Sequence, residues 1–329
     1  MALAILLPED ILGPDFRLLA VAVALDLLLG DPVYRFHPVR LIGHTLSGFE
    51  RALRKLGWNG YGGGIALFLL LACLWCGGLG ALVVGLAQYN NLIALAVHLF
   101  LLYSFIALRD LLRHGWAVED AARRGDLLAA RRAVSQLVGR DTDRMDLAAC
   151  RRAAIESLSE NLTDGFVSAL FWYVLGGLPG IVLFKVVSTM DSMVGYKTPR
   201  YLRFGWCGAR LDDAMNWFPA RLTWLLITCM ALPFAGCSAK KALQVGWRQH
   251  ARVPGPNSGW SEAAIAGAIQ RRLAGPIWKN QHLVNEVWLG DRSDPPAATG
   301  ADMGRATALV IAAALAAVAI AVASLVALR

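Results

Sequence analysis

Three acidic residues recur at every fourth position of one segment, at Glu156, Glu160 and Asp164. On a helix this spacing places them on one face, where like charges repel. A protein tolerates such repulsion where a cation or a basic partner binds, and magnesium takes carboxylate oxygens beside substrate phosphates. The spacing therefore indicates a site for magnesium or a basic group, and a solvated acidic helix face is the alternative.

Two further polar clusters follow in the sequence, at residues 188–197 and 209–221. The first combines an acid, three aliphatic hydroxyls and a cation within ten residues, and the second contains two adjacent acids. Adjacent carboxylates cannot both point the same way from a helix, so we expect one to bind a metal while the other pairs with an arginine. Helix capping and ion pairing are the alternative for each cluster. The candidate residues are Asp191, Lys197, Arg210, Asp212, Asp213 and Asn216.

A fourth cluster, at residues 254–264, begins with a Pro-Gly-Pro loop and continues into a predicted helix. Asn257 and Glu262 are its candidate binding residues, and an ordinary loop at a helix start is the alternative. Several familiar signatures are absent: the chain has no phosphate-binding G-x-x-x-x-G-K-[ST] motif, no dinucleotide G-x-G-x-x-G in a strand–helix context and no G-x-S-x-G. Mononucleotide-binding P-loops, dinucleotide folds and serine hydrolases are therefore not predicted.

The segments that must position these residues are strongly apolar. Of 329 residues 57% are hydrophobic and 17% are charged, against about 25% charged in soluble domains. No charged residue occurs from Leu56 to Leu108, a run of 53 residues, and a second uncharged run covers 306–328. A spanning helix needs about 20 apolar residues, so the composition predicts a membrane protein.

We therefore predict an all-α, multi-pass integral membrane protein that forms one membrane-embedded domain over 1–329. Its broken or re-entrant segments are expected near 166–187, where glycines and a proline interrupt an apolar stretch, and near 221–236. Membrane spans are expected near residues 18–30, 64–86, 92–108 and 306–328, with an amphipathic helical loop at 109–160. In that loop, Asp126 and either Asp141 or Thr142 are predicted helix N-caps.

Charge predicts the orientation in the membrane. Residues 109–156 contain ten Lys and Arg, which the positive-inside rule places in the cytoplasm. The net charge of +8 is explained in the same way, and because basic residues are mixed with acids no nucleic-acid partner is expected. If the clusters form one site, residues 166–187 must enter and leave the membrane on the cytoplasmic face or be buried in protein. Labelling of Cys207 from outside the cell would contradict this topology.

Taken together, ordered motifs over residues 20–290 resemble the CobD/CbiB family, the adenosylcobinamide-phosphate synthases of cobalamin biosynthesis. The motifs that carry the resemblance are Asp26-Leu-Leu-Leu-Gly-Asp-Pro32 with His37-Pro-Val-Arg40, Gly139-Arg-Asp-Thr142, and the segments 156–165, 189–197, 209–221 and 256–264. The resemblance implies an integral membrane enzyme of the late corrin pathway. We expect it in the bacterial inner membrane, with its active site facing the cytoplasm as the charge distribution predicts. It also implies an ATP-dependent amide ligase that joins adenosylcobyric acid to aminopropanol or its phosphate.

On this interpretation ATP and magnesium are the expected cosubstrate and metal. Other late cobalamin-pathway membrane enzymes are further candidate partners besides the bilayer. We assign Glu156, Glu160, Asp164, Asp191, Asp212 and Asp213 as carboxylates that bind magnesium or orient the amine, the first four as magnesium ligands. The candidates for phosphate and substrate binding are Arg140, Asn161, Lys197, Arg210, Asn216, Asn257 and Glu262.

Two other classes of protein remain open. A transporter is compatible with broken helices and acids near the membrane, although no inverted repeat is visible. An AmpE-like membrane sensor of the same superfamily is the second alternative, and it would not need all six acids.

Overall fold

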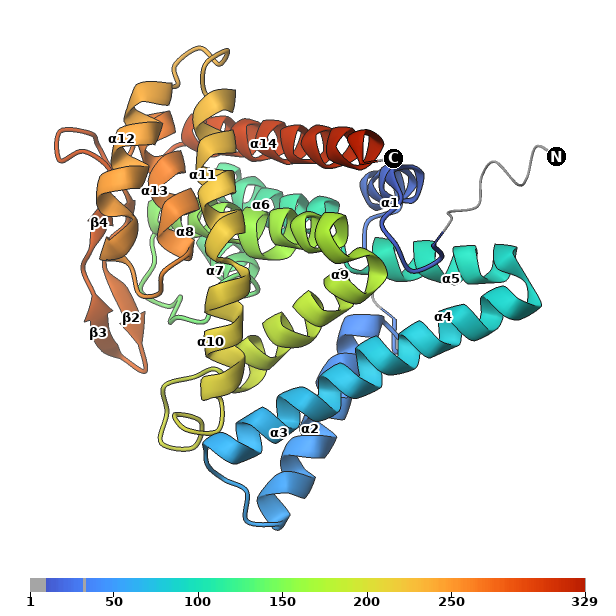
Figure 1. The fold of residues 1–329 in the computed structure, drawn as a ribbon. Helices are drawn as coiled ribbons and strands as arrows, with labels where there is room; N and C mark the ends of the chain where they lie inside the picture. Colours follow the sequence, from blue (N-terminus) through green and yellow to red (C-terminus); the bar gives the residue numbers. More distant parts are fainter. Residues whose placement is uncertain (1–9, 32–33, 329) are drawn as a thin grey trace. The chain divides into compact units, whose positions relative to one another are not determined.

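The computed structural model describes residues 10–31 and 34–328, so Pro32 of the 26–32 motif lies outside the described residues. The described chain is mostly helical and has few strand residues, which confirms the predicted all-α fold (Figure 1). It forms two compact units. The first unit contains residues 1–107, 168–215 and 318–329, and the second contains residues 108–167 and 216–317.

Among the described residues, four helical stretches are long and apolar enough to cross a membrane, as expected of a multi-pass membrane protein. They are Tyr61–Tyr89, Asn91–Arg123, Leu147–Val194 and Gly300–Ala327. The predicted spans at 64–86 and 92–108 fall within two of them, and the span predicted at 306–328 matches Gly300–Ala327 to within one residue at its end. The first predicted span corresponds to a helix of only 14 residues, Phe16–Leu29, which is shorter than a perpendicular crossing requires.

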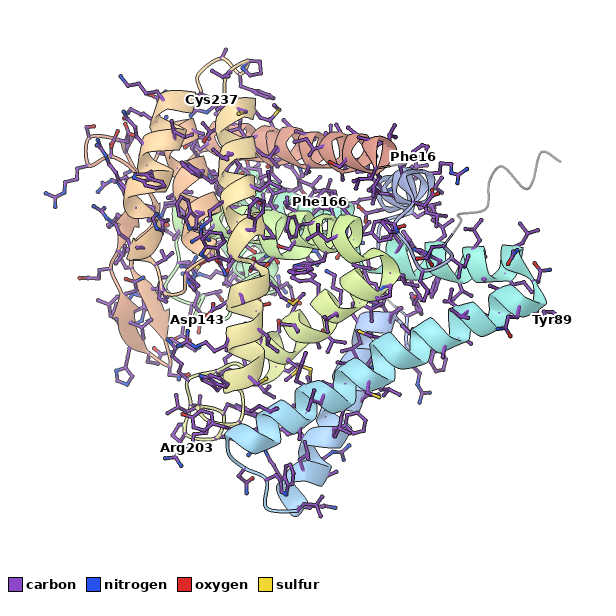
Figure 2. All side chains as sticks on the ribbon, viewed as in Figure 1. Phe16, Tyr89, Asp143, Phe166, Arg203 and Cys237 are labelled. Carbon is purple, nitrogen blue, oxygen red and sulfur yellow. The ribbon has the colours of Figure 1, made fainter. Side chains whose placement is uncertain are left out.

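The helices described in the first unit are connected by turns and loops. They are α1 (Phe16–Leu29), α2 (Pro38–Lys55), α3 (Tyr61–Ala72), α4 (Gly78–Tyr89), α5 (Asn91–Ser104), α9 (Ser168–Val194) and α10 (Trp206–Met215). A π-helical stretch, Cys73–Gly77, joins α3 to α4 into one long helix. The chain then reverses at an uncharged turn beside Tyr89 (Figure 2), where the Asn90 side chain caps α5 by accepting the backbone N–H of Leu92 over 2.8 Å.

The predicted interruption near 166–187 is confirmed within α9. Gly177 has φ of 58°, which breaks the helix into two arms that meet at an angle (Figure 1). A Cβ at Gly177 would lie 2.2 Å from the backbone oxygen of Leu12, so only glycine permits this approach. The N–H of Leu178 donates to the same oxygen over 2.9 Å, which satisfies a group that the break would leave free.

The second unit packs its other helices around α13 (Ser258–Ile269), whose residues from Gly259 to Ile269 are all buried. Its remaining helices are α6 (Leu108–Arg123), α7 (Leu127–Val134), α8 (Leu147–Asn161), α11 (Trp217–Met230), α12 (Ala239–Gln249), and α14 (Gly300–Ala327) up to residue 317. A π-helical stretch, Leu162–Val167, follows α8, and a 3₁₀ stretch, His250–Arg252, follows α12. Close packing depends on glycine, since a Cβ at Gly267 would lie 2.4 Å from the backbone oxygen of Lys241.

Four short strands in the second unit were not predicted from the sequence. They are β1 (Leu273–Ala274), β2 (Ile277–Lys279), β3 (His282–Asn285) and β4 (Trp288–Leu289). They pair antiparallel as β1 with β4 and β2 with β3. The predicted segment 221–236 contains the end of α11 at Met230, and a turn rather than a helix occupies 231–238.

Of the two helix N-caps predicted in the 109–160 loop, one is confirmed and the other is wrong. Asp126 accepts the N–H of Ala129 over 2.9 Å and caps α7, as predicted. Asp141 and Thr142 do not cap α8, because the helix begins five residues later and Asp146 caps it by accepting the N–H of Ala149 over 2.6 Å. Asp141 has a different role, described below.

Candidate functional site

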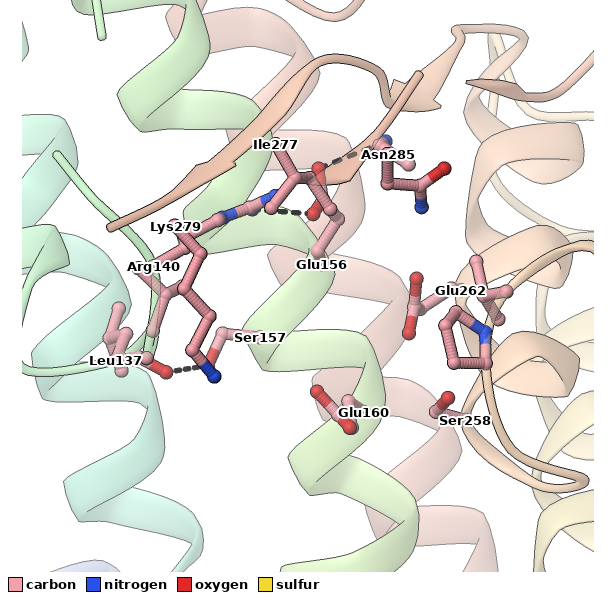
Figure 3. Close-up of a pocket in the computed structure, with 15 residues that line it drawn as sticks. Leu137, Arg140, Glu156, Ser157, Glu160, Ser258, Glu262, Ile277, Lys279 and Asn285 are labelled. Carbon is pink, nitrogen blue, oxygen red and sulfur yellow. Dashed lines mark hydrogen bonds and ion pairs between the residues drawn. The ribbon is translucent and has the colours of Figure 1, made fainter. Parts of the chain in front are cut away.

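A cavity of about 360 Å³ lies within the second unit, and its lining combines acidic and basic side chains. Helices α8 and α13 form two of its walls, and the β2–β3 hairpin forms another (Figure 3). Its polar lining residues are Arg140, Glu156, Ser157, Glu160, Ser258, Glu262, Lys279 and Asn285. Four of the site residues predicted from the sequence are therefore brought together from segments more than 100 residues apart.

Glu160 of α8 and Glu262 of α13 form the acidic side of the cavity. Their carboxylates and the Ser258 hydroxyl point into the same space (Figure 3). Within the described part of the chain, neither carboxylate has a hydrogen bond or an ion pair, although Glu262 is buried. Two such carboxylates facing one cavity form a ready binding surface for a cation.

The electrostatics of the cavity act most strongly on Glu262. Burial raises the pKa of Glu262 well above its ordinary value, and the neighbouring charges of Glu160 and Glu156 raise it further. The positive charge of Arg140 opposes this shift without cancelling it. A carboxyl group whose pKa is moved toward neutrality can exchange a proton under cellular conditions, which an ordinary glutamate does poorly.

Arg140 and Glu156 form the opposite side. Nη2 of Arg140 donates to Oε2 of Glu156 over 2.6 Å, and both side chains are largely buried. The other oxygen, Oε1, accepts the backbone N–H of Ala274 over 2.9 Å. Because both of its oxygens are engaged, Glu156 positions the Arg140 guanidinium and the β1 segment. Lys279 on β2 adds a second cation to the lining.

The β2–β3 hairpin reaches the cavity because Asp141 holds its turn. The Asp141 carboxylate accepts the N–H groups of Asn280 and Gln281, at 3.3 and 2.7 Å, where both residues have positive φ. Its own N–H donates to the oxygen of Trp278 over 2.8 Å. Because successive side chains of a strand alternate, Lys279 lines the cavity while Trp278 lies on the other face, under the Arg144 guanidinium at 4.1 Å.

Other predicted residues of the second unit lie outside the cavity lining. Asp164 falls in the π-helical segment Leu162–Val167, where the wider turn changes the direction of side chains relative to α8. Its charge still contributes to the raised pKa of Glu262. Asn161 donates to the oxygen of Ser157 over 2.9 Å, and Asn257 accepts from Nη1 of Arg221 over 3.4 Å. Asn216 is buried directly before α11.

The remaining predicted residues form a second cluster, within the first unit. Asp191 near the end of α9 and Asp213 of α10 lie close enough for their charges to repel. Burial raises the pKa of Asp213, while Arg210 and Lys197 oppose the rise, Arg210 through an ion pair of 3.4 Å. A Cβ at Gly195 would lie 2.0 Å from Oδ1 of Asp191, so glycine leaves room for this carboxylate. Asp212 precedes Asp213 on the same helix and is partly exposed.

No group of three or more His, Cys, Asp or Glu side chains among the described residues is arranged to hold a metal ion on its own. Magnesium does not require one, because it keeps several waters and commonly uses one or two carboxylates together with substrate phosphates. Glu160 and Glu262, with their converging oxygens, fit that donor set. Glu156 fits it less well, since both of its oxygens are engaged.

Comparison with known proteins identifies the family to which these motifs belong. The family model described as CobD/Cbib protein matches residues 19–325 of this chain. The chain belongs to the CobD/CbiB family. The match covers both units, and all four acidic clusters lie within it.

Curated members of the CobD/CbiB family are similar over most of their length. Cobalamin biosynthesis protein CobD of Pelobacter propionicus is 42% identical over 278 residues, which cover 84% of this chain and 86% of the relative. Cobalamin biosynthesis protein CobD of Yersinia enterocolitica is 38% identical over 82% of this chain and 86% of its own. Cobalamin biosynthesis protein CbiB of Salmonella choleraesuis is 37% identical, with the same two shares. No solved structure matches the chain.

The structure adds lining residues that sequence reasoning missed. Ser157, Ser258, Lys279 and Asn285 contribute polar atoms to the cavity, and none was a predicted site residue. Ser157 and Ser258 lie within the clusters identified in the sequence, so their positions could have marked them as candidate site residues. Lys279 and Asn285 lie on strands too short to leave a pattern, and only the long-range bonds of Asp141 and Glu156 bring them to the cavity.

Proposed function

We propose that this CobD/CbiB family protein is an enzyme of cobalamin biosynthesis, an ATP-dependent ligase. It would join the free carboxylate of adenosylcobyric acid to the amine of aminopropanol or aminopropanol phosphate, giving adenosylcobinamide or its phosphate. The observation that supports this most is the cavity of the second unit, in which an acidic side (Glu160 and Glu262) faces a basic side (Arg140 and Lys279). Such a cavity suits a reaction between a phosphorylated acid and an amine.

Amide formation requires activation, because a carboxylate has no good leaving group. Transfer of the γ-phosphoryl group of ATP to the corrinoid carboxylate would give an acyl phosphate and ADP. Attack by the amine nitrogen would then form the C–N bond, break the C–O bond to phosphate and release inorganic phosphate. The amine must first lose a proton, because its ammonium form has no free electron pair.

The residues of the cavity can be matched to these needs. Arg140, held in place by Glu156, would bind phosphate oxygens, with Lys279 as a second cation. Glu160 would hold magnesium together with substrate phosphates, and the metal would neutralise phosphate charge. Glu262, whose pKa is raised by burial, would take the proton of the ammonium group and leave the nucleophilic amine.

The first-unit cluster is a second part of this proposal. Asp191 and Asp213 with Arg210 and Lys197 would bind the nucleotide or the corrinoid. We further propose that the protein lies in the inner membrane with both clusters facing the cytoplasm, where ATP is available. The ten basic residues of 109–156 support this orientation.

A reaction with purified full-length protein in detergent tests the ligase proposal. The mixture contains ATP, magnesium and adenosylcobyric acid with either aminopropanol or aminopropanol phosphate, and mass spectrometry follows the corrinoid. We expect an amide product that requires both ATP and the amine, with ADP formed in equal amount. No product with either amine, or substrate uptake into proteoliposomes without ligation, would contradict the ligase and support a transporter.

A further inference from the structure

Helix α12 presents two different faces. One face packs into the second unit: Ala242, Val245, Gly246 and Gln249 are buried. The fit is close, since a Cβ at Gly246 would lie 2.4 Å from the Trp224 ring. The helix is therefore fixed by its inner face, and its outer face is free to contact something else.

The outer face combines apolar and basic side chains. Leu243 is 43% exposed and Trp247 is 63% exposed, one helical turn apart. Lys240 and Arg248 are exposed on the same face, and neither has an ion pair among the described residues. Lys241 differs, because it lies toward the protein and its Nζ contacts Asp294 over 2.9 Å. Unpaired basic side chains next to exposed apolar groups are typical of helices that lie in a membrane interface.

A hydrogen bond connects the turn before this helix to α14, one of the helices long and apolar enough to cross a membrane. Arg305 directly precedes the uncharged run 306–328, so it marks the level at which α14 enters the apolar layer. Nη1 of Arg305 donates over 3.3 Å to the backbone oxygen of Gly236, two residues before the Ser238 cap of α12. The start of α12 is therefore held at the depth of the interface.

The direction of α12 agrees with this depth. Within the second unit, α12 runs crosswise to α14 rather than beside it, and Cys237 marks the turn that leads into it (Figures 1 and 2). If α14 crosses the bilayer, a helix crosswise to it lies along the membrane surface. At 11 residues α12 is also too short to cross.

Exposed aromatic side chains gather at one end of α12, which also indicates a position at the membrane interface. Trp247 packs against the rings of Trp224 and Trp260, each with ring centroids 5.9 Å apart, yet most of its surface is exposed. Trp217 and Phe218 at the start of α11 are also more than half exposed. Aromatic side chains of this kind are enriched where apolar and aqueous phases meet.

We infer that α12 lies in the plane of the membrane interface and binds the head groups of anionic lipids. Lys240 and Arg248 contact the lipid phosphates, while Leu243 and Trp247 enter the layer just below them. The positive charge of this face complements an anionic bilayer, and the bond of Arg305 to the turn before α12 places the helix beside the start of the α14 apolar run.

Spin labelling of the full-length protein in lipid nanodiscs tests the depth of this face. Leu243→Cys and, as a control, His282→Cys on the exposed β3 strand are labelled in a background without native cysteines. We expect the label at 243 to be accessible to oxygen and shielded from a water-soluble nickel complex, and the label at 282 to show the reverse. Nickel accessibility at 243 equal to that at 282 would overturn the inference. Shielding from both reagents would indicate a protein partner and would also overturn it.

A second measurement uses the native cysteine background. The association of a spin-labelled phosphatidylglycerol with the protein is compared with that of phosphatidylcholine. For Lys240→Gln/Arg248→Gln we expect the preference for phosphatidylglycerol to fall about tenfold, because each basic residue near an anionic surface contributes separately. The control, Arg132→Gln, removes an exposed charge on α7 and should change little. An unchanged preference in the α12 variant, or an equal fall in the control, would refute lipid binding by α12.

Discussion

Nη2 of Arg140 lies 2.6 Å from Oε2 of Glu156, while the other oxygen of the same carboxylate accepts the N–H of Ala274. One side chain of α8 thus fixes both a guanidinium and the strand that leads into the β2–β3 hairpin. Glu160 lies one helical turn further along α8 and opens into the cavity. Glu156 and Glu160 therefore have different roles, although they belong to one regularly spaced set of acidic residues. The role of each can be tested separately.

Glu156→Gln is expected to lower both stability and activity. The largely buried Arg140 charge would lose its ionised partner, which costs about 2 kcal/mol or more of unfolding free energy. Arg140→Met/Glu156→Gln should regain part of the stability, because no unpaired charge remains, while ligation stays low since the phosphate-binding cation is gone. Thermal unfolding in detergent and ligation kinetics measure the two effects. A double variant no more stable than the single one would show that the ion pair is not the cause.

Glu262→Gln should reduce kcat/KM for ligation by about 100-fold or more, because the amide can neither accept the ammonium proton nor carry charge. The matched control is Glu286→Gln, which removes an exposed acid between β3 and β4 that does not line the cavity. The control should retain normal turnover. Equal rates for Glu262→Gln and the wild type would remove Glu262 from the mechanism.

Glu160→Gln should weaken magnesium binding and leave proton transfer unaffected. We expect the magnesium concentration for half-maximal rate to rise about tenfold, since one carboxylate ligand is lost. The rate at saturating magnesium should fall less than in Glu262→Gln. Titration of the rate with magnesium distinguishes the two variants, and an unaltered titration curve would exclude Glu160 as a ligand.

The raised pKa of Glu262 predicts how stability and activity depend on pH. The folded protein keeps this proton to higher pH than the unfolded chain, so it binds more protons between the ordinary and the raised pKa. Stability without substrates is therefore expected to fall as the pH rises from about 4.3, the ordinary value for glutamate, to the raised value. Over the same range kcat/KM should rise, because the ionised base forms. Glu262→Gln should lose this component of the stability profile, and an identical profile would contradict the assignment.

Asp191→Asn is expected to abolish amide formation while the protein still inserts into the membrane. Gly195→Ala should have a similar effect, because its Cβ would lie 2.0 Å from Oδ1 of Asp191 and must displace that carboxylate. Asp120→Asn, on the exposed surface of α6, is the control and should remain active. Membrane insertion is checked by fractionation and turnover by the ligation assay. Normal turnover in Asp191→Asn would exclude this residue from the reaction.

The orientation of residues 195–205 needs a different probe from the one the sequence suggested. Cys207 is only 8% exposed, so a failure to label it would carry no information about its side of the membrane. Arg203 is exposed (Figure 2), and Arg203→Cys in a background without native cysteines replaces it. We expect an impermeant thiol reagent to label this variant only after the cells are opened. Labelling in intact cells would contradict a cytoplasmic site.

Composition and local spacing were sufficient for the class of fold. The charge-free run 56–108 predicted two apolar helices, and the glycines and proline of 176–180 predicted the break in α9. These features are local: a chain without charges over 53 residues is unstable in water wherever it lies, and glycine at positive φ ends a helix whatever surrounds it. Asp126 was predicted as a cap for the same reason, since a capping bond spans three residues.

The arrangement of the cavity depended on contacts between distant segments. The sequence spacing predicted that Glu156, Glu160 and Asp164 share one helix face. The π-helical turn after α8 changes the direction of the Asp164 side chain, and no local sequence pattern predicts such a turn. Asp141 resembled a helix cap, yet it binds N–H groups 139 and 140 residues away. A carboxylate binds whichever donors the fold brings within hydrogen-bonding distance, and only the packing of α8, α13 and the hairpin determines which donors those are.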